Sequence, residues 1–264
     1  MLYYLCMTKE QINLNNNNSK ILKQVQNDNA NTYYETLDEN FNQALNLFEN
    51  DLSHSEIIKL LQVGNIAQKQ IAALKIDHIT SNNEAFTLTK NLVGQDGKIR
   101  EAVALKILEF FENNNYINYF YDNNIYDILL NAIIDVNSNV CRNIISAICI
   151  LKTNTSFTKY FCPKLITLTK DLTEKVKEFD FQDGKYKVNK EVFKLYWCLE
   201  TIYELSDFIN IDDLKNILNQ TQNINEYTIR EKTAKILSKG FQDSELNQIR
   251  NNLKSDKNYY VRRF

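Results

Sequence analysis

The sequence has 264 residues, of which 44% are hydrophobic and 24% charged, and its formal net charge at pH 7 is −2. This apolar content and near-balanced charge exclude a disordered chain, and the chain has no apolar stretch of the roughly 20 residues that a transmembrane helix needs. With five glycines and one proline, the chain lacks the turn residues that sandwiches, barrels and doubly wound folds require. The composition therefore favours an all-α fold.

The first predicted segment is an Asn-rich tail over residues 1–32. It contains the run from Asn15 to Asn18, and asparagine disfavours regular structure, so we expect this tail to be largely disordered. The apolar stretch Leu2–Met7 is too short for a secretory signal and has no basic residue before it. Five scattered cysteines are untypical of a disulfide framework. We therefore expect a cytoplasmic protein with reduced thiols.

After this tail, apolar residues recur at helical spacing, as in Phe41, Leu45 and Phe48. Ser53, followed three residues later by Glu56, predicts a capping box at the start of a helix. Short polar breaks alternate with slightly longer ones. This alternation predicts helical hairpins that stack on one another through residue 264.

A short motif recurs at the predicted start of the second helix of several hairpins. It consists of an acidic residue or asparagine, a β-branched residue, a basic residue and then small residues, and its copies lie at 65–76, 94–107, 135–142, 226–237 and 256–262. In the weak third copy, Cys141 occupies the usual basic position and Arg142 follows it. A further unit without the motif has its second helix at 188–207. Such internal repetition is the mark of a repeat architecture.

The motif resembles the HEAT repeat of the armadillo-like superfamily. The resemblance covers residues 55–264, about six units with the last cut short, and implies a right-handed α-solenoid used as a binding surface. Each hairpin of such a fold buries its apolar face against its neighbours. In that family the Asp and Arg of the motif typically form a ladder between neighbouring units. By resemblance, the structural ladder here consists of Lys69, Asp96, Arg100, Arg142, Arg230, Asp256 and Arg262.

The segment 179–188 departs from the helical pattern. Apolar and polar residues alternate on either side of Asp183-Gly184, which predicts a type I′ turn and a small β-hairpin inserted between two helices. Such an insertion would shape one end of a groove, since insertions in repeat proteins map to one face. The alternative is a long polar turn with no role.

The single tryptophan, Trp197, marks the candidate binding groove. On the helix expected at 188–207 it falls opposite the apolar stripe, with Phe193, Glu200 and Glu204 beside it. An aromatic ring beside carboxylates can anchor a basic or aromatic residue of a partner. Alternatively, Trp197 packs against a neighbouring helix.

Residues with catalytic or metal-binding spacing are not found. The glycines do not form a phosphate-binding loop. His54, expected at a helix terminus, and His78 are too isolated in the sequence for a two-His zinc motif. Cys141 and Cys149 are out of phase on one helix. We therefore expect no catalytic residue, no metal and no cofactor.

Two functions remain in view, together with a third that the residues neither favour nor exclude. The first is a non-enzymatic scaffold or adaptor that presents a curved groove for protein–protein binding. The second is a nucleic-acid-binding or DNA-repair HEAT solenoid, because Trp197 with Glu200 or Glu204 resembles, in residue type, the Trp and Asp of alkylpurine DNA glycosylases. The balanced net charge disfavours it, because phosphate binding draws on clustered Lys and Arg. The third is an accessory subunit resembling the HEAT-like lyase partners of pigment-protein assembly.

The last predicted unit carries an apolar end with Tyr259, Tyr260 and Phe264. An exposed apolar patch of this kind marks an interaction site. We expect it to be covered by the N-terminal tail, by a second copy of the chain through self-association, or by a partner.

Overall fold

The computed structural model describes residues 42–113, 115–177 and 190–264. The chain separates into two compact units, Met1–Asp51 and Leu52–Phe264. The first contains a short helix at 42–49 among its described residues. The predicted tail at 1–32, its boundary at residue 33 and the predicted β-hairpin near 179–188 lie outside the described residues.

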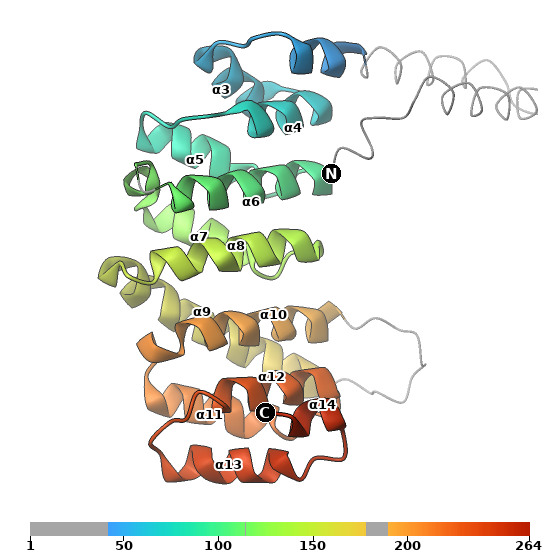
Figure 1. Ribbon diagram of the computed structural model, residues 1–264, viewed down its shortest axis with the longest axis vertical. Coiled ribbons are helices and arrows are strands. Elements are labelled where there is room, and N and C mark those ends of the chain that lie inside the picture. Colours follow the sequence, from blue (N-terminus) through green and yellow to red (C-terminus); the bar gives the residue numbers. More distant parts are fainter. Residues whose placement is uncertain (1–41, 114, 178–189) are drawn as a thin grey trace, which may run out of the picture. The chain divides into compact units, whose positions relative to one another are not determined.

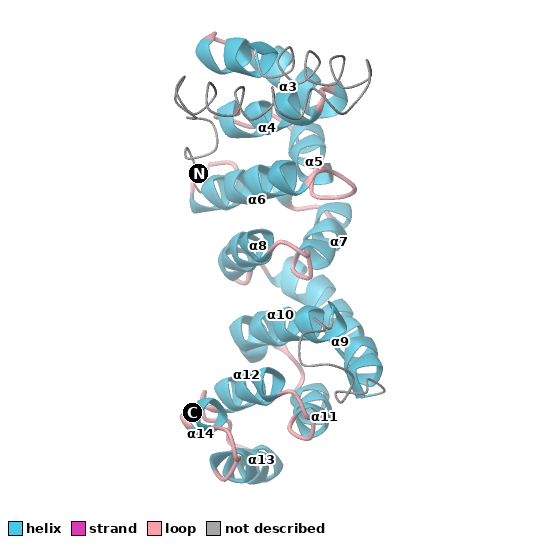
Figure 2. Ribbon diagram, turned by 90° about the vertical axis from the view of Figure 1, so that its right-hand side faces the viewer, coloured by secondary structure: helices cyan, strands magenta, loops and turns pink. Residues whose placement is uncertain are grey.

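The described part of the chain is all-α, as its composition predicts. Helices and connecting loops make up the described ranges, and no strand occurs in them (Figure 2). No helix in these ranges is long and apolar enough to cross a membrane.

The second unit is built from consecutive pairs of helices (Figure 1). In chain order, the pairs are α3 (His54–Val63) with α4 (Ile66–Lys75), α5 (Asn82–Lys90) with α6 (Gly97–Glu112), α7 (Asn123–Ala132) with α8 (Ser138–Leu151), α9 (Thr155–Lys177) with α10 (Lys190–Leu205), α11 (Ile211–Thr221) with α12 (Tyr227–Leu237), and α13 (Ser244–Lys254) with α14 (Tyr259–Arg262). Two short 3-10 helices, η2 (Ile117–Phe120) and η3 (Ser206–Phe208), lie in the connections.

Local sequence sets where these helices begin. Ser53 and Glu56 form the predicted capping box at the start of α3. The recurring motif supplies the N-cap of most second helices, where a side-chain oxygen accepts a backbone N–H of the first turn; these N-caps are Asn65, Asp96, Asn137, Glu226 and Asn258. A side-chain cap of this kind stabilises a helix by about 1 kcal/mol relative to alanine.

The helices of the second unit form two layers. The first helices of the pairs, α3, α5, α7, α9, α11 and α13, each pack on the next in their own series, and the second helices, α4 through α14, do the same. Each hairpin also packs its two helices together. Figures 1 and 2 show the two series side by side.

A continuous apolar core runs between the layers from Ile57 to Val261. Its largest fully buried side chains include Phe111 and Phe120, whose ring centroids lie 4.9 Å apart in an edge-to-face pair. Ala104 of α6 is fully buried. Small residues of this kind let neighbouring helices approach closely.

The two layers differ in exposure. Helix α9 of the first layer exposes Lys159, Pro163 and Thr167 to solvent. By contrast, every residue from 191 to 206, in α10 and its C-terminal end, is buried or half-buried. Helix α10 is therefore more enclosed than its partner α9.

Candidate functional site

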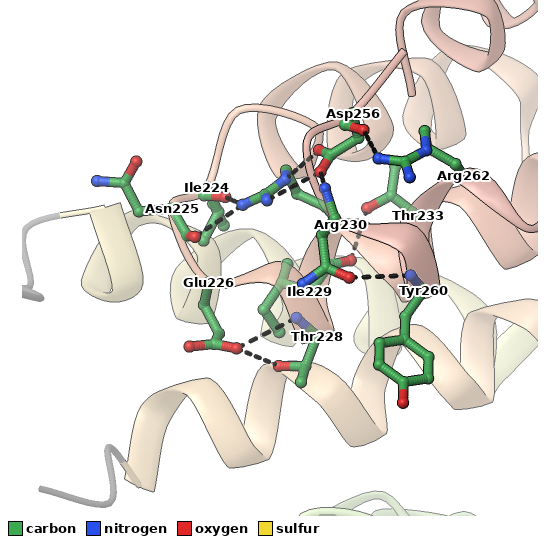
Figure 3. Close-up of polar contacts among 11 residues, drawn as sticks. Ile224, Asn225, Glu226, Thr228, Ile229, Arg230, Thr233, Asp256, Tyr260 and Arg262 are labelled. Atoms are coloured by element: carbon green, nitrogen blue, oxygen red, sulfur yellow. Dashed lines mark hydrogen bonds and ion pairs between the residues drawn. The ribbon is translucent and has the colours of Figure 1, made fainter. Parts of the chain in front are cut away.

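The recurring motif forms a joint between neighbouring hairpins, seen most clearly at Arg230 of α12 (Figure 3). Its Nε lies 2.6 Å from Asp256 Oδ2, and its Nη2 donates to Asp256 Oδ1 at 3.2 Å. Its Nη1 donates to the carbonyls of Ile224 and Asn225, both at 2.7 Å. The side chain of Arg230 is buried, and this guanidinium lowers the pKa of the Asp256 carboxyl from its usual value. The joint ties α12 to the turn before α14.

Arg100 of α6 makes the equivalent joint to the turn before α8. Its Nε lies 2.6 Å from Asp135 Oδ2, its Nη2 lies 3.0 Å from Asp135 Oδ1, and its Nη1 donates to the carbonyl of Gln95. The hydrogen bonds to Asp135 raise the pKa of Arg100. Asp135 also accepts the backbone N–H of Asn137 at 2.7 Å. Asp256 does the same for Asn258, so the two joints match in detail.

Two residues of the expected ladder take other roles. Asp96 caps α6 by accepting the N–H of Lys98, and Asp135, which was not among the expected ladder residues, is the partner of Arg100. Arg142 is exposed and bonds to Asn139 of its own helix. The reason is helical phase: Cys141 is the residue four positions after the N-cap, so Arg142 points away from the joint.

Lys69 and Arg262 lie at the joint with a single hydrogen bond each. Lys69 donates to Gln95 Oε1 at 3.3 Å, which joins α4 to the turn before α6. Arg262 donates to the carbonyl of Asp256 at 2.6 Å and is exposed.

Trp197 does not project from the second-helix layer. It is 8% exposed, and its ring lies edge-on to Phe193 at 6.1 Å and to Tyr196 at 5.3 Å between centroids. Because α10 packs on α8, α9 and α12, the side opposite its apolar stripe is covered as well. The structure thus brings Phe193 and Trp197 together in packing rather than in an open groove. The indole Nε1 has no hydrogen-bond partner among the described residues.

Glu200 of α10 links α10 to α12. Its carboxylate receives Lys232 Nζ at 2.5 Å and Lys235 Nζ at 2.7 Å. Burial alone raises the pKa of Glu200, but the two ammonium groups lower it below its usual value. The carboxylate is therefore ionised and already paired.

A row of lysines over tyrosines covers the same two helices, and we call it the tyrosine–lysine ridge; it comprises Tyr196, Tyr203, Lys232, Lys235 and Lys239. Lys232 Nζ lies 4.3 Å from the ring centroid of Tyr196, and Lys235 Nζ lies 4.2 Å from that of Tyr203. Lys239 Nζ lies 4.7 Å from the Tyr203 centroid. Tyr196 and Tyr203 lie two turns apart on α10, whereas the lysines follow one another at one-turn spacing along α12, with Lys239 just past its C-terminal end. This spacing is visible in the sequence and could have indicated the ridge.

Glu204, the last residue of the predicted groove, lies half-buried near Cys149. The Cys149 thiol has its pKa raised to about 12, first by burial and then by the charge of Glu204 and a hydrogen bond to it. Burial likewise raises the pKa of Cys141 and Cys198 to about 12 and that of Cys162 to about 11. A nucleophilic or metal-binding cysteine needs the thiolate form, so these thiols are not poised for either role.

The expected isolation of the two histidines is wrong. The rings of His54 and His78 stack with centroids 4.0 Å apart. Packing of α3 against α4 and α5 brings the two histidine rings together, and the spacing of the histidines along the sequence does not predict this contact. At the other end of the unit, Tyr259 and Tyr260 are exposed and Phe264 is half-buried beneath Arg263.

Comparison with known proteins gives little beyond the structure. No protein-family model matches the sequence, and the search of curated proteins finds no match either. One solved structure, an engineered protein, is 15% identical; the match covers 79% of this chain and 91% of that one with a TM-score of 0.43.

Proposed function

We propose that the second unit is a HEAT-like α-solenoid that acts as a non-enzymatic scaffold and binds a protein partner across its second-helix layer. The packing of each helix on the next of its own series supports the solenoid. Further support comes from the matched Arg100–Asp135 and Arg230–Asp256 joints, which repeat one contact between successive hairpins.

The tyrosine–lysine ridge is the observation that carries the binding role. Tyr196 and Tyr203 are half-buried rings with lysines already seated over them. Tyrosine rings held in place lose little entropy on binding, and tyrosine is among the residues that dominate the energetics of interfaces. Lys232 and Lys235 share the single carboxylate of Glu200, so the ridge has an excess of positive charge. Its complement is a protein segment that carries carboxylates.

The experiment is site-specific photo-crosslinking in the native host. A photoreactive amino acid at Tyr203 should capture a discrete partner, and the matched position Lys159, exposed on α9 of the first layer, should not. Lys239→Glu should then weaken binding of that partner, while Lys159→Glu leaves it unchanged. Equal capture from both positions, or equal effects of both charge reversals, would refute the proposed face.

The nucleic-acid alternative receives less support from the geometry. A glycosylase-like site needs an exposed aromatic ring and an unpaired carboxylate, whereas Trp197 is buried and Glu200 is paired with two lysines. Titration with duplex DNA separates the two functions, because phosphate binding weakens steeply as salt rises. The scaffold proposal expects no salt-dependent affinity at low ionic strength, and tight salt-sensitive binding would favour the alternative.

A further inference from the structure

The only two histidines of the sequence meet at one end of the second unit. His54 is the first residue of α3, and His78 lies in the link between α4 and α5. Their rings are nearly parallel, with an interplanar angle of 20°. Asp77 places its Oδ1 2.6 Å from His78 Nδ1. One potential ligand atom from each of His54, Asp77 and His78 lies within 4.8 Å of the others.

The ring of His54 has unmet hydrogen-bonding capacity. Its side chain is 23% exposed, and both ring nitrogens are shielded from solvent without a well-aligned hydrogen bond to any described residue. Glu84 Oε2 lies 3.0 Å from Nε2. A proton on Nε2 directed at this carboxylate would leave the lone pair of Nδ1 free. A buried polar atom without a partner is costly, and a bound cation would remove that cost.

The surrounding residues hold the cluster in place. The capping box of Ser53 and Glu56 fixes the first turn of α3, which carries His54. Glu84 is itself held by Thr80, whose backbone N–H and Oγ1 donate to the carboxylate at 2.8 and 2.9 Å. Ile79, 2% exposed, anchors the link next to His78. A metal site needs a supporting shell of this kind.

We propose that His54, Asp77 and His78 bind a divalent transition-metal ion of the zinc class, with Glu84 as the positioning residue that orients His54. Two imidazole nitrogens and one carboxylate oxygen are ligands typical of Zn²⁺, with a fourth position open to water. Mg²⁺ and Ca²⁺ prefer oxygen ligands alone, so the two imidazoles select against them. A metal lies in the plane of each imidazole ring that binds it, so at least one of the two stacked rings would turn about its side-chain bonds on binding. The ion would then cross-link the start of α3 to the link before α5.

The direct test uses full-length protein labelled with ¹⁵N on histidine. Because the chain has two histidines, each imidazole nitrogen can be followed during titration with Zn²⁺. Both rings should shift together and saturate at one equivalent. Co²⁺ should give the visible absorption of a tetrahedral site without the intense charge-transfer band that cysteine ligands produce. A shift of one ring alone, no shift at all, or a thiolate band would overturn the proposal.

Substitutions define the ligand set. His78→Asn and Asp77→Asn should each weaken Zn²⁺ binding at least about 100-fold, and Glu84→Gln about 10- to 100-fold, as loss of an orienting partner does. Asp77 and His78 are the more exposed members, so both variants should keep the helical circular dichroism of the parent. The control is Asp122→Asn, which alters a carboxylate at the N-cap of α7, where asparagine also caps well. It should leave affinity unchanged; equal affinity of Asp77→Asn and Asp122→Asn would contradict the site.

Discussion

Replacing Arg230 with methionine tests whether the repeated Arg–Asp joint holds neighbouring hairpins together. Methionine keeps much of the aliphatic stem but removes both hydrogen bonds to Asp256 and both hydrogen bonds to backbone carbonyls. The Asp256 side chain is 10% exposed, so the substitution leaves a shielded carboxylate without its counter-ion. Removing one partner of a buried ion pair typically costs about 3–5 kcal/mol. We therefore expect Arg230→Met to lower the free energy of unfolding of the C-terminal hairpins by about 3–5 kcal/mol.

The loss should be local. Helix α14 packs on α12 and α13, so breaking the joint frees α13 and α14 before the earlier helices. Native-state hydrogen exchange followed residue by residue is the assay, because it resolves the opening of separate parts of one chain. Amides of α12–α14 should lose protection in Arg230→Met, while those of α6 and α8 keep theirs.

Two further variants make the result interpretable. Arg262→Met removes an exposed side chain with one contact to a carbonyl, and its cost should stay below about 1 kcal/mol. The double variant Arg230→Met/Asp256→Leu removes both charges and should recover part of the loss, since an apolar replacement of a buried pair is often near neutral. Equally mild effects of Arg230→Met and Arg262→Met would show that the joint contributes nothing measurable to the stability of the C-terminal hairpins.

Three other outcomes follow from the structure. Arg230 lowers the pKa of Asp256 in the folded protein. The ionised Asp256 carboxylate therefore stabilises the fold above its unfolded pKa near about 3.9, and this stabilisation is lost as pH falls through the lower folded pKa. In acid titrations of the free energy of unfolding, Asp256→Asn should lose less stability than the parent protein. Gly240 has a φ of +80°, and no atom lies within 4 Å of the position that a Cβ would take. Gly240→Ala should therefore lower the free energy of unfolding by about 1–2 kcal/mol, measured with heat or urea, from backbone strain alone. The control Gly97→Ala, in the first turn of α6, should be neutral or stabilising by up to about 1 kcal/mol. Cys198, fully buried with its pKa raised to about 12 by burial, should resist alkylation at pH 8 until the protein unfolds, and rapid modification in the native state would contradict the packing of α10.

The sequence was sufficient for the fold class because helical spacing and capping are local properties. The acidic residues of two motif copies, Asp96 and Glu226, mark the beginnings of α6 and α12 as predicted. The capping box at Ser53 also appears as expected. These features depend on residues within one turn of each other, which the sequence displays directly.

The candidate site was harder to predict because it depends on which helices pack together. A helical projection places Trp197 opposite the apolar stripe of α10, but it does not reveal that α8, α9 and α12 cover three sides of that helix. The contact of His54 with His78 and the pairing of Glu200 with Lys232 also depend on which helices pack together, so the sequence alone did not predict them. Arg142 was misplaced by one residue, since one step along a helix turns a side chain by about 100°.

A set of distances within the second unit tests whether its hairpins form a linear stack. Spin labels introduced as non-canonical amino acids, which leave the native cysteines in place, can be put at the exposed starts of second helices, at Ile66 of α4, Lys98 of α6 and Tyr227 of α12. Successive second helices pack at about 8–10 Å. The proposed linear stack therefore predicts that the α4–α12 separation exceeds the α4–α6 separation severalfold, at roughly 30–40 Å. Equal separations for the two pairs would indicate helices gathered around one closed centre and would contradict the account.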